Sequence, residues 1–233
     1  MLITFEEKRD DIIFRVSKFH EKYEKILKMC FYEVDGDSYI KRFSKDIKNI
    51  DRIKANYKKS AEEMFSQLGY FKPIPWEDAL LEFVKRLNGK GVDWWLTGSC
   101  AACIRGIPLN PHDVDIMIDS KYASDISEIF SDCLVEPIVD TKGWVTKDFG
   151  VIFCHARIDI ASDPSECLDE PEPSDAGPYA KQHLERIKWK GYEIKVPPLG
   201  LQLNVNKTRK RMERVKLIEE YINKNIAVHE KIV

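Results

Sequence analysis

Apolar residues recur at steps of three and four along the first 70 residues, which is the spacing of amphipathic helices. One apolar stripe runs from Ile12 to Leu27, and a second runs from Ile40 to Leu68. Residues 35–38 separate the two stripes with Asp and Gly, which favour a turn. We therefore predict an N-terminal helical hairpin. Residues 1–70, called here the N-terminal region, are expected to form a helical domain of their own.

The pattern changes after residue 70, where short apolar runs alternate with helical stretches. Residues 162–178 contain no Lys or Arg and predict a long exposed loop or a lid. Residues 71–233 are thus expected to form an α+β domain, with a mixed-sheet core and a helical C-terminal tail. Strands are predicted at 94–97, 114–118, 134–139, 143–147, 151–155 and 156–161, a hairpin at 187–196, and helices at 75–87, 99–105 and 121–130.

Composition is that of a globular protein, with 43% hydrophobic and 33% charged residues. The formal net charge of −2 provides no overall attraction to nucleic acid or to an anionic membrane. Charged residues stand where a signal peptide would need its apolar stretch, and no apolar run reaches the ~18 residues of a membrane span. We expect a cytoplasmic protein, without membrane contact, whose six cysteines are reduced.

A turn that suits phosphate is predicted at Gly98-Ser99, between a buried strand and a helix. Glycine lets a ligand approach the backbone, and the start of a helix offers free N–H groups to an anion. The Ser99 hydroxyl adds a donor. Alone, this dipeptide is a weak signal, because Gly-Ser is also common in ordinary turns.

Carboxylates form the second candidate feature. Asp113 and Asp115 are two residues apart on a predicted strand, so both project from one face. Asp159 stands between two isoleucines on a later strand. If the two strands are neighbours, three carboxylates converge, and like charges at close range favour a bound cation. Oxygen ligands of this kind suit Mg²⁺, and three of them predict a two-metal site.

Other polar residues have two interpretations each. Arg105, Lys207 and Arg211 could bind the phosphates of a substrate or belong to solvated surfaces. His112 could tune the neighbouring carboxylate or end a loop. Cys100 and Cys103 could bind zinc or act in redox chemistry, but no second cysteine pair accompanies them. They are more simply explained as small residues that let a helix pack closely on the sheet.

The order Gly98-Ser99, then Asp113 and Asp115 around one hydrophobic residue, then Asp159 on another strand resembles the nucleotidyltransferase superfamily of DNA polymerase β type. The resemblance covers about residues 75–220. The basic tail at 207–214 is similar to that of small bacterial members, which include antibiotic-modifying and toxin–antitoxin proteins.

The resemblance implies a palm-like mixed sheet and transfer of a nucleoside monophosphate from an NTP to a hydroxyl, with release of pyrophosphate. It implies two Mg²⁺ ions, or Mn²⁺, held by Asp113, Asp115 and Asp159, with the triphosphate at Gly98 and Ser99. The acceptor is left open: a small molecule, an RNA end or a protein. Two alternatives are a non-catalytic nucleotide-binding module and an interaction protein that forms homo-oligomers through the N-terminal region.

Overall fold

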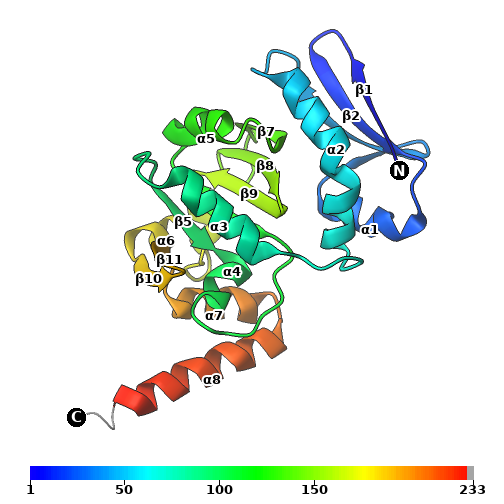
Figure 1. Cartoon of the computed structure of the whole chain (residues 1–233). Coiled ribbons are helices and arrows are strands. Elements are labelled where there is room, and N and C mark those ends of the chain that lie inside the picture. The colour runs from blue at the N-terminus through cyan, green and yellow to red at the C-terminus, as the bar shows by residue number, and fades with distance from the viewer. Residues whose placement is uncertain (230–233) are drawn as a thin grey trace.

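The structure is a computed structural model that describes residues 1–229. It confirms the α+β fold class with a mixed central sheet, and Figure 1 shows the N-terminal region beside that sheet. In the described part of the chain, no helix has both the length and the apolar character needed to cross a membrane.

The predicted N-terminal helical hairpin is wrong, because a strand at Asp11–Ser17 replaces the start of its first helix and a strand at Ser38–Ser44 replaces the start of its second. Four strands form an antiparallel sheet in the order β1-β2-β4-β3. Along β2, Ile12, Phe14 and Val16 belong to the main hydrophobic core, while Ile13 faces away from it and is covered by its neighbours. Buried residues on both faces imitate a helical spacing. The elements of this region are β1 (Leu2–Glu7), β2 (Asp11–Ser17), α1 (Glu24–Met29), β3 (Glu33–Asp35), β4 (Ser38–Ser44) and α2 (Ile50–Leu68).

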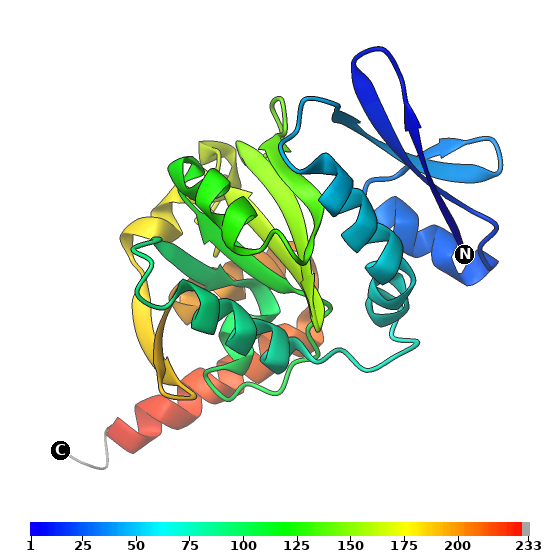
Figure 2. The same ribbon diagram turned by 45° about the horizontal axis from the view of Figure 1, so that its top comes forward.

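The helix α2 lies between the N-terminal sheet and the central sheet, as Figures 1 and 2 both show. On one side, Tyr57 packs edge-on against Phe5 and Phe14, with ring centroids 6.3 and 5.1 Å away. The side chains of Phe14 and Tyr57 are fully buried. Since α2 also contacts β7 and β9, both sheets share one hydrophobic core. The boundary predicted at residue 70 stays a prediction.

The central sheet has the strand order β5-β6-β9-β8-β7, in which only β6 and β9 run parallel. The strand predicted at 143–147 is wrong. Lys142 and Gly143 both have positive φ and form the turn between β7 and β8, so the chain reverses there. The strands are β5 (Trp94–Thr97), β6 (Val114–Ile118), β7 (Leu134–Asp140), β8 (Asp148–Cys154) and β9 (Ala156–Ser162).

Helices and a hairpin surround this sheet. The apolar side of α3 packs on β6, β8 and β9, and the predicted hairpin is present as β10 and β11. The C-terminal tail is helical, as predicted. The remaining elements are α3 (Trp76–Leu87), α4 (Gly98–Cys103), α5 (Ala123–Ile129), α6 (Pro178–Gln182), β10 (Glu185–Trp189), β11 (Tyr192–Val196), α7 (Leu199–Thr208) and α8 (Met212–His229), with short 3-10 turns at Glu21–Tyr23, Ser120–Tyr122 and Glu166–Asp169.

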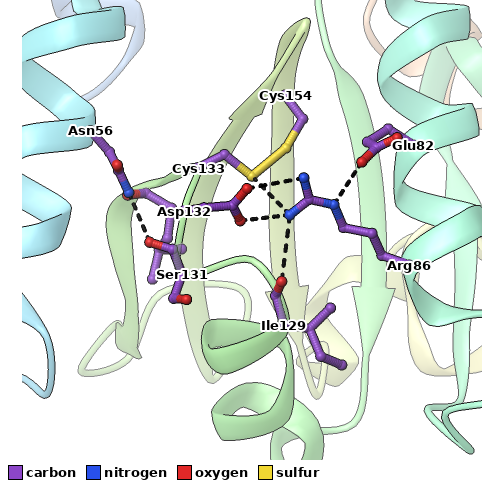
Figure 3. A network of polar contacts seen from close by, with 9 residues as sticks. Asn56, Glu82, Arg86, Ile129, Ser131, Asp132, Cys133 and Cys154 are labelled. Atoms are coloured by element: carbon purple, nitrogen blue, oxygen red, sulfur yellow. Dashed lines mark hydrogen bonds and ion pairs between the residues drawn. A yellow bond between two sulfur atoms is a disulfide. The ribbon is translucent and has the colours of Figure 1, made fainter.

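The connection between α5 and β7 is held from two sides, as Figure 3 shows. From α3, Arg86 donates two hydrogen bonds to the carboxylate of Asp132, at 2.6 and 3.1 Å. From α2, the amide of Asn56 donates to the backbone carbonyls of Ser131 and Leu134, at 2.9 and 3.0 Å. The Asn56 bonds fix α2, and with it the N-terminal region, to the edge of the central sheet.

A disulfide joins Cys133 to Cys154 (Figure 3), so the expectation that all six cysteines are reduced is wrong. Cys133 directly precedes β7 and Cys154 ends β8, its antiparallel neighbour. This pairing brings their Cα atoms to 5.9 Å, within the range that a disulfide needs. Cys100 is buried in the core and donates to the backbone carbonyl of Asp113, in agreement with a packing role.

A buried ion pair also connects the N-terminal region to the central sheet. The Glu136 carboxylate of β7 accepts hydrogen bonds from Lys41 Nζ at 2.6 Å and Tyr32 Oη at 2.8 Å. Burial alone would raise the pKa of Glu136, but the attraction of Lys41 and of Arg157 brings that pKa below its usual value. Glu136 is therefore charged at neutral pH inside the protein.

We expect Lys41→Met to lower the free energy of unfolding by about 3–5 kcal/mol, because it leaves a buried carboxylate without its ammonium partner. Thermal or urea unfolding measures the loss. The control is Lys48→Met, which removes a pair with Glu128 whose two side chains are about three quarters exposed, and which should change little. Similar losses in both variants would contradict this account. The double variant Lys41→Met/Glu136→Leu should recover part of the loss.

Candidate active site

The three predicted carboxylates meet in the structure because β6 and β9 are parallel neighbours. Asp115 and Asp159 are register partners in this pair, and Asp113 precedes Asp115 by two residues. One carboxylate oxygen from each residue lies within 4.8 Å of the other two. Val114 and Ile116 point into the core on the opposite face of the sheet. Three carboxylate oxygens at this spacing are a donor set that fits Mg²⁺.

Burial and mutual repulsion set the charge of this acidic cluster. Burial is the main cause that raises the pKa of Asp113 and of Asp115, and for Asp115 the charges of Asp113 and Asp159 add to it. Burial also raises the pKa of Asp159 to about 6, although Arg157 opposes the shift. The cluster therefore favours a proton or a cation over three free charges.

Arg157 is the fixed counter-charge of this cluster, and the sequence analysis missed it. Its side chain is 5% exposed, and it donates to both oxygens of Asp159, at 2.6 and 3.2 Å. A third hydrogen bond goes to the Cys30 Sγ of the N-terminal region, at 3.5 Å. The signal was present in the sequence, because a residue two positions before Asp159 on a strand shares its face.

Glycine is required at position 98 by its close contact with Asp115. Its φ is +64°, and a Cβ added there would lie 2.1 Å from the Oδ2 atom of Asp115. Its N–H donates to the carboxylate of Asp175 at 3.3 Å, so this donor is already used within the chain. The Ser99 hydroxyl accepts a hydrogen bond from Arg214 at 2.9 Å.

A cavity of about 690 Å³ opens over the acidic cluster and the Gly98-Ser99 turn. On one side, four cationic side chains from the junction of α7 and α8 line it. The pKa of Arg211 is lowered, mainly by burial and then by repulsion from Arg214 and Arg209. This repulsion shows that the three guanidinium groups lie close to one another. Such a cluster suits a polyanion. The cationic lining residues are Arg209, Lys210, Arg211 and Arg214.

Two of the predicted phosphate-binding residues lie elsewhere. Arg105 donates to Glu185 at 2.5 Å and to the carbonyl of Pro197, so its guanidinium is engaged away from the cavity. Lys207 pairs with Glu219 at 3.2 Å, and it does not line the cavity. Arg211 does line it. The tail therefore contributes cations to the site, but from its second half, at the turn between α7 and α8.

The acidic loop 162–178 supplies a residue that the sequence analysis did not single out. Asp175 is 8% exposed, and its backbone carbonyl accepts a hydrogen bond from the buried Thr97 hydroxyl. Burial raises the pKa of Asp175, while Arg209 and the hydrogen bonds that it accepts oppose this rise. No sequence signal separates it from the other acids of the loop. The loop is thus anchored against the Gly98 turn at this point.

The N-terminal region forms another wall of the cavity. Its prediction as a domain of its own did not suggest a contribution to the site. Met29, Cys30, Phe31 and Leu68 line it. His112 lies at the same rim, where its ring packs on Tyr70 with centroids 4.3 Å apart. Burial lowers the pKa of His112, which keeps the ring neutral at neutral pH.

The fold and the site together define a class. A mixed sheet that presents three aspartates beside a Gly-Ser turn is the arrangement of a nucleotidyltransferase, as the sequence resemblance implied. Residues 79–171 match the family model described as aminoglycoside-2''-adenylyltransferase. The predicted resemblance is therefore confirmed, and the chain is an enzyme of the nucleotidyltransferase class. The comparison with curated proteins found no match.

Three solved structures show weaker similarity. A candidate nucleotidyltransferase from Thermotoga maritima, TM1012, is 22% identical over 63% of this chain and 91% of its own, with a TM-score of 0.47. The lincosamide antibiotic adenylyltransferase LnuA, bound to lincomycin, is 14% identical over 62% and 97%, with a TM-score of 0.44. ANT(2'')-Ia, in complex with adenylyl-2''-tobramycin, is 12% identical over 67% and 99%, with a TM-score of 0.41. The class assignment does not depend on these three.

We expect Gly98→Ala to weaken Mg²⁺ binding, because the added Cβ must displace the Asp115 carboxylate. It should also lower stability, since an L-residue at this φ costs about 1–2 kcal/mol. The control is Gly91→Ala, where φ is +72° but a Cβ would meet nothing within 4 Å. Calorimetric Mg²⁺ titration and thermal melts compare the two. Equal Mg²⁺ affinities in the two variants would show that the contact with Asp115 has no effect on the site.

In metal-free protein, the contribution of the acidic cluster to stability should fall as the pH rises from about 4 to 7. In this pH range, carboxyl groups with a raised pKa bind more protons in the folded state than in the unfolded state. The free energy of unfolding that they contribute therefore decreases as the pH rises. Asp115→Asn removes one of them, so its melting temperature should rise relative to wild type as the pH increases. Melts in EDTA measure this, with the exposed Asp125→Asn as control. A difference that is independent of pH would contradict the prediction.

Proposed function

We propose that the chain transfers a nucleoside monophosphate from an NTP to a hydroxyl of a small molecule and releases pyrophosphate. The observation that carries the proposal is the division of the cavity. The acidic cluster lies at its floor, and the four cations of the α7–α8 junction line one side. A metal–triphosphate needs both kinds of charge in one cavity, because carboxylates hold the metal while cations bind the phosphates.

Each residue then has a role that follows from its position. Asp113 and Asp115 would hold both metal ions, and Asp159 would hold only the ion nearer the acceptor. Divalent ions held there would lower the pKa of the attacking hydroxyl and neutralise the leaving pyrophosphate. Ser99, Arg211 and Arg214 bind and orient the triphosphate. Arg157 keeps the Asp159 carboxylate in a fixed orientation, with two hydrogen bonds.

ATP is the donor to test first, because the matched family is described as adenylyltransferases. The experiment incubates the chain with α-labelled ATP, CTP, GTP or UTP, with Mg²⁺ or Mn²⁺, and with pools of hydroxyl compounds that include aminoglycosides and lincosamides. Label transferred to an acceptor, with equal release of pyrophosphate, supports the proposal. The proposal would be contradicted if no pool of acceptors increased the release of pyrophosphate and no label appeared on any acceptor.

Asp159→Asn should separate binding from turnover. We expect Mg²⁺–ATP to bind within about tenfold of wild type, because Asp113 and Asp115 remain, while transfer falls by about 10²-fold or more. Asp115→Asn should lose both, and Asp125→Asn neither. Because Asp159→Asn leaves the buried Arg157 with a weaker acceptor, melts must show that the variant is folded. Equal losses of affinity and rate would instead assign Asp159 to both metal ions.

A further inference from the structure

The strand order gives the cavity two chemically different ends. Across the sheet, the Gly98 end of β5 comes first, followed by Asp115 on β6 and Asp159 on β9. Ser99 lies at the β5 end, where it accepts a hydrogen bond from Arg214 of the cationic lining. At the β9 end, Arg157 contacts Cys30, which places residues 29–31 of the N-terminal region against this end. If the proposed function holds, the acceptor enters from the β9 end, because its hydroxyl attacks opposite the leaving pyrophosphate.

The wall at the β9 end is apolar and exposed. Met29 and Phe31 line the cavity and are 50% and 63% exposed. The residues of the N-terminal region that line the cavity, Met29, Cys30, Phe31 and Leu68, include no charged side chain. Two large apolar side chains that are exposed in the lining of one cavity are candidates for a binding surface, because folding gains nothing from leaving them in water.

The backbone holds Phe31 in this exposed position. Its φ is +61°, because Phe31 follows the last turn of α1, and the N–H groups of Phe31 and Tyr32 close that turn by donating to the carbonyls of Lys28 and Leu27, each at 3.0 Å. The Phe31 ring also packs edge-on against Trp144 of the β7–β8 turn, with centroids 5.3 Å apart. Trp144 is itself 43% exposed and packs on Phe149. The aromatic surface thus continues from the cavity rim onto the central domain.

We infer that Met29, Phe31 and Trp144 form an acceptor subsite for an uncharged small molecule that carries an aromatic ring next to its reactive hydroxyl. The ring would stack on Phe31, and the hydroxyl would point towards Asp159. This inference rests on the proposed function for the direction of the hydroxyl. The aromatic surface itself depends only on the contacts of the three side chains.

The test compares two probes with the same sugar hydroxyls, phenyl β-D-glucopyranoside and methyl β-D-glucopyranoside. Kanamycin serves as a polycationic alternative. Saturation-transfer NMR measures the affinity of the protein for each probe. The measurement is made in the presence of Mg²⁺ and a non-hydrolysable ATP analogue, and is repeated without nucleotide. Wild type should bind the phenyl glucoside about tenfold more tightly than the methyl glucoside, the usual size of an aromatic contact with its buried area.

Phe31→Ala should reduce this preference to about twofold or less. The control is Phe71→Ala, which removes a 45% exposed aromatic side chain that does not line the cavity. It should leave the preference unchanged. Neither substitution removes a buried side chain, and melts confirm folding. The Kd of the Mg²⁺–ATP analogue should stay within about twofold in both variants.

Three results would overturn the inference. The first is a wild type without preference for the phenyl glucoside, or a preference that survives Phe31→Ala. The second is kanamycin binding more tightly than the phenyl glucoside and independently of Phe31, which indicates a cationic acceptor. The third is a large loss of ATP-analogue affinity in Phe31→Ala, which assigns the ring to the nucleobase. If wild type binds no Mg²⁺–ATP analogue, the proposed function fails, and the nucleotide-free titration still decides the aromatic subsite.

Discussion

Repulsion among three buried carboxylates is the constraint on which the rest of the site depends. Asp113, Asp115 and Asp159 are brought together by a parallel strand pair, and the pKa of each is raised, mainly by burial. Among the described residues, Arg157 is the cation in direct contact with the cluster, and of the three aspartates it bonds to Asp159. The remaining charge must be balanced by protons or by metal ions. This repulsion favours a bound cation at the cluster, and the three carboxylate oxygens are a donor set that fits a divalent ion.

Arg157 also explains why the N-terminal region belongs to the site. Its guanidinium contacts Cys30, and its charge helps to keep the buried Glu136 ionised. Glu136 in turn pairs with Lys41 of β4. A chain of buried polar contacts thus runs from the acidic cluster to the N-terminal sheet. A region fixed in this way can place a side chain such as Phe31 at a constant distance from the reacting atoms, which a loosely attached domain cannot do.

The sequence was most informative where one local signal determined the structure. Strands β5 and β6 fall at the predicted residues, because short apolar runs end at Gly98 and begin after Asp113. The convergence of Asp113, Asp115 and Asp159 followed from strand periodicity. The N-terminal region was predicted wrongly because β2 buries Ile13 as well as Ile12 and Phe14. Apolar residues on both faces of the strand conceal the alternation of apolar and polar residues that would have identified it. Asp175 and Phe31 could not be found, since their importance arises from contacts between segments far apart in the sequence.

The match to adenylyltransferases covers residues 79–171, which include the acidic cluster and the Gly98-Ser99 turn but neither flank of the cavity. The two flanks differ in chemistry: cations from the α7–α8 junction on one side, apolar side chains of residues 29–31 on the other. The reaction needs the same carboxylates and phosphate contacts whatever the acceptor is, so these constrain the centre and the cationic flank. Specificity for the acceptor must then come from the flank that the chemistry leaves free. In the proposed reaction, the N-terminal region provides that flank.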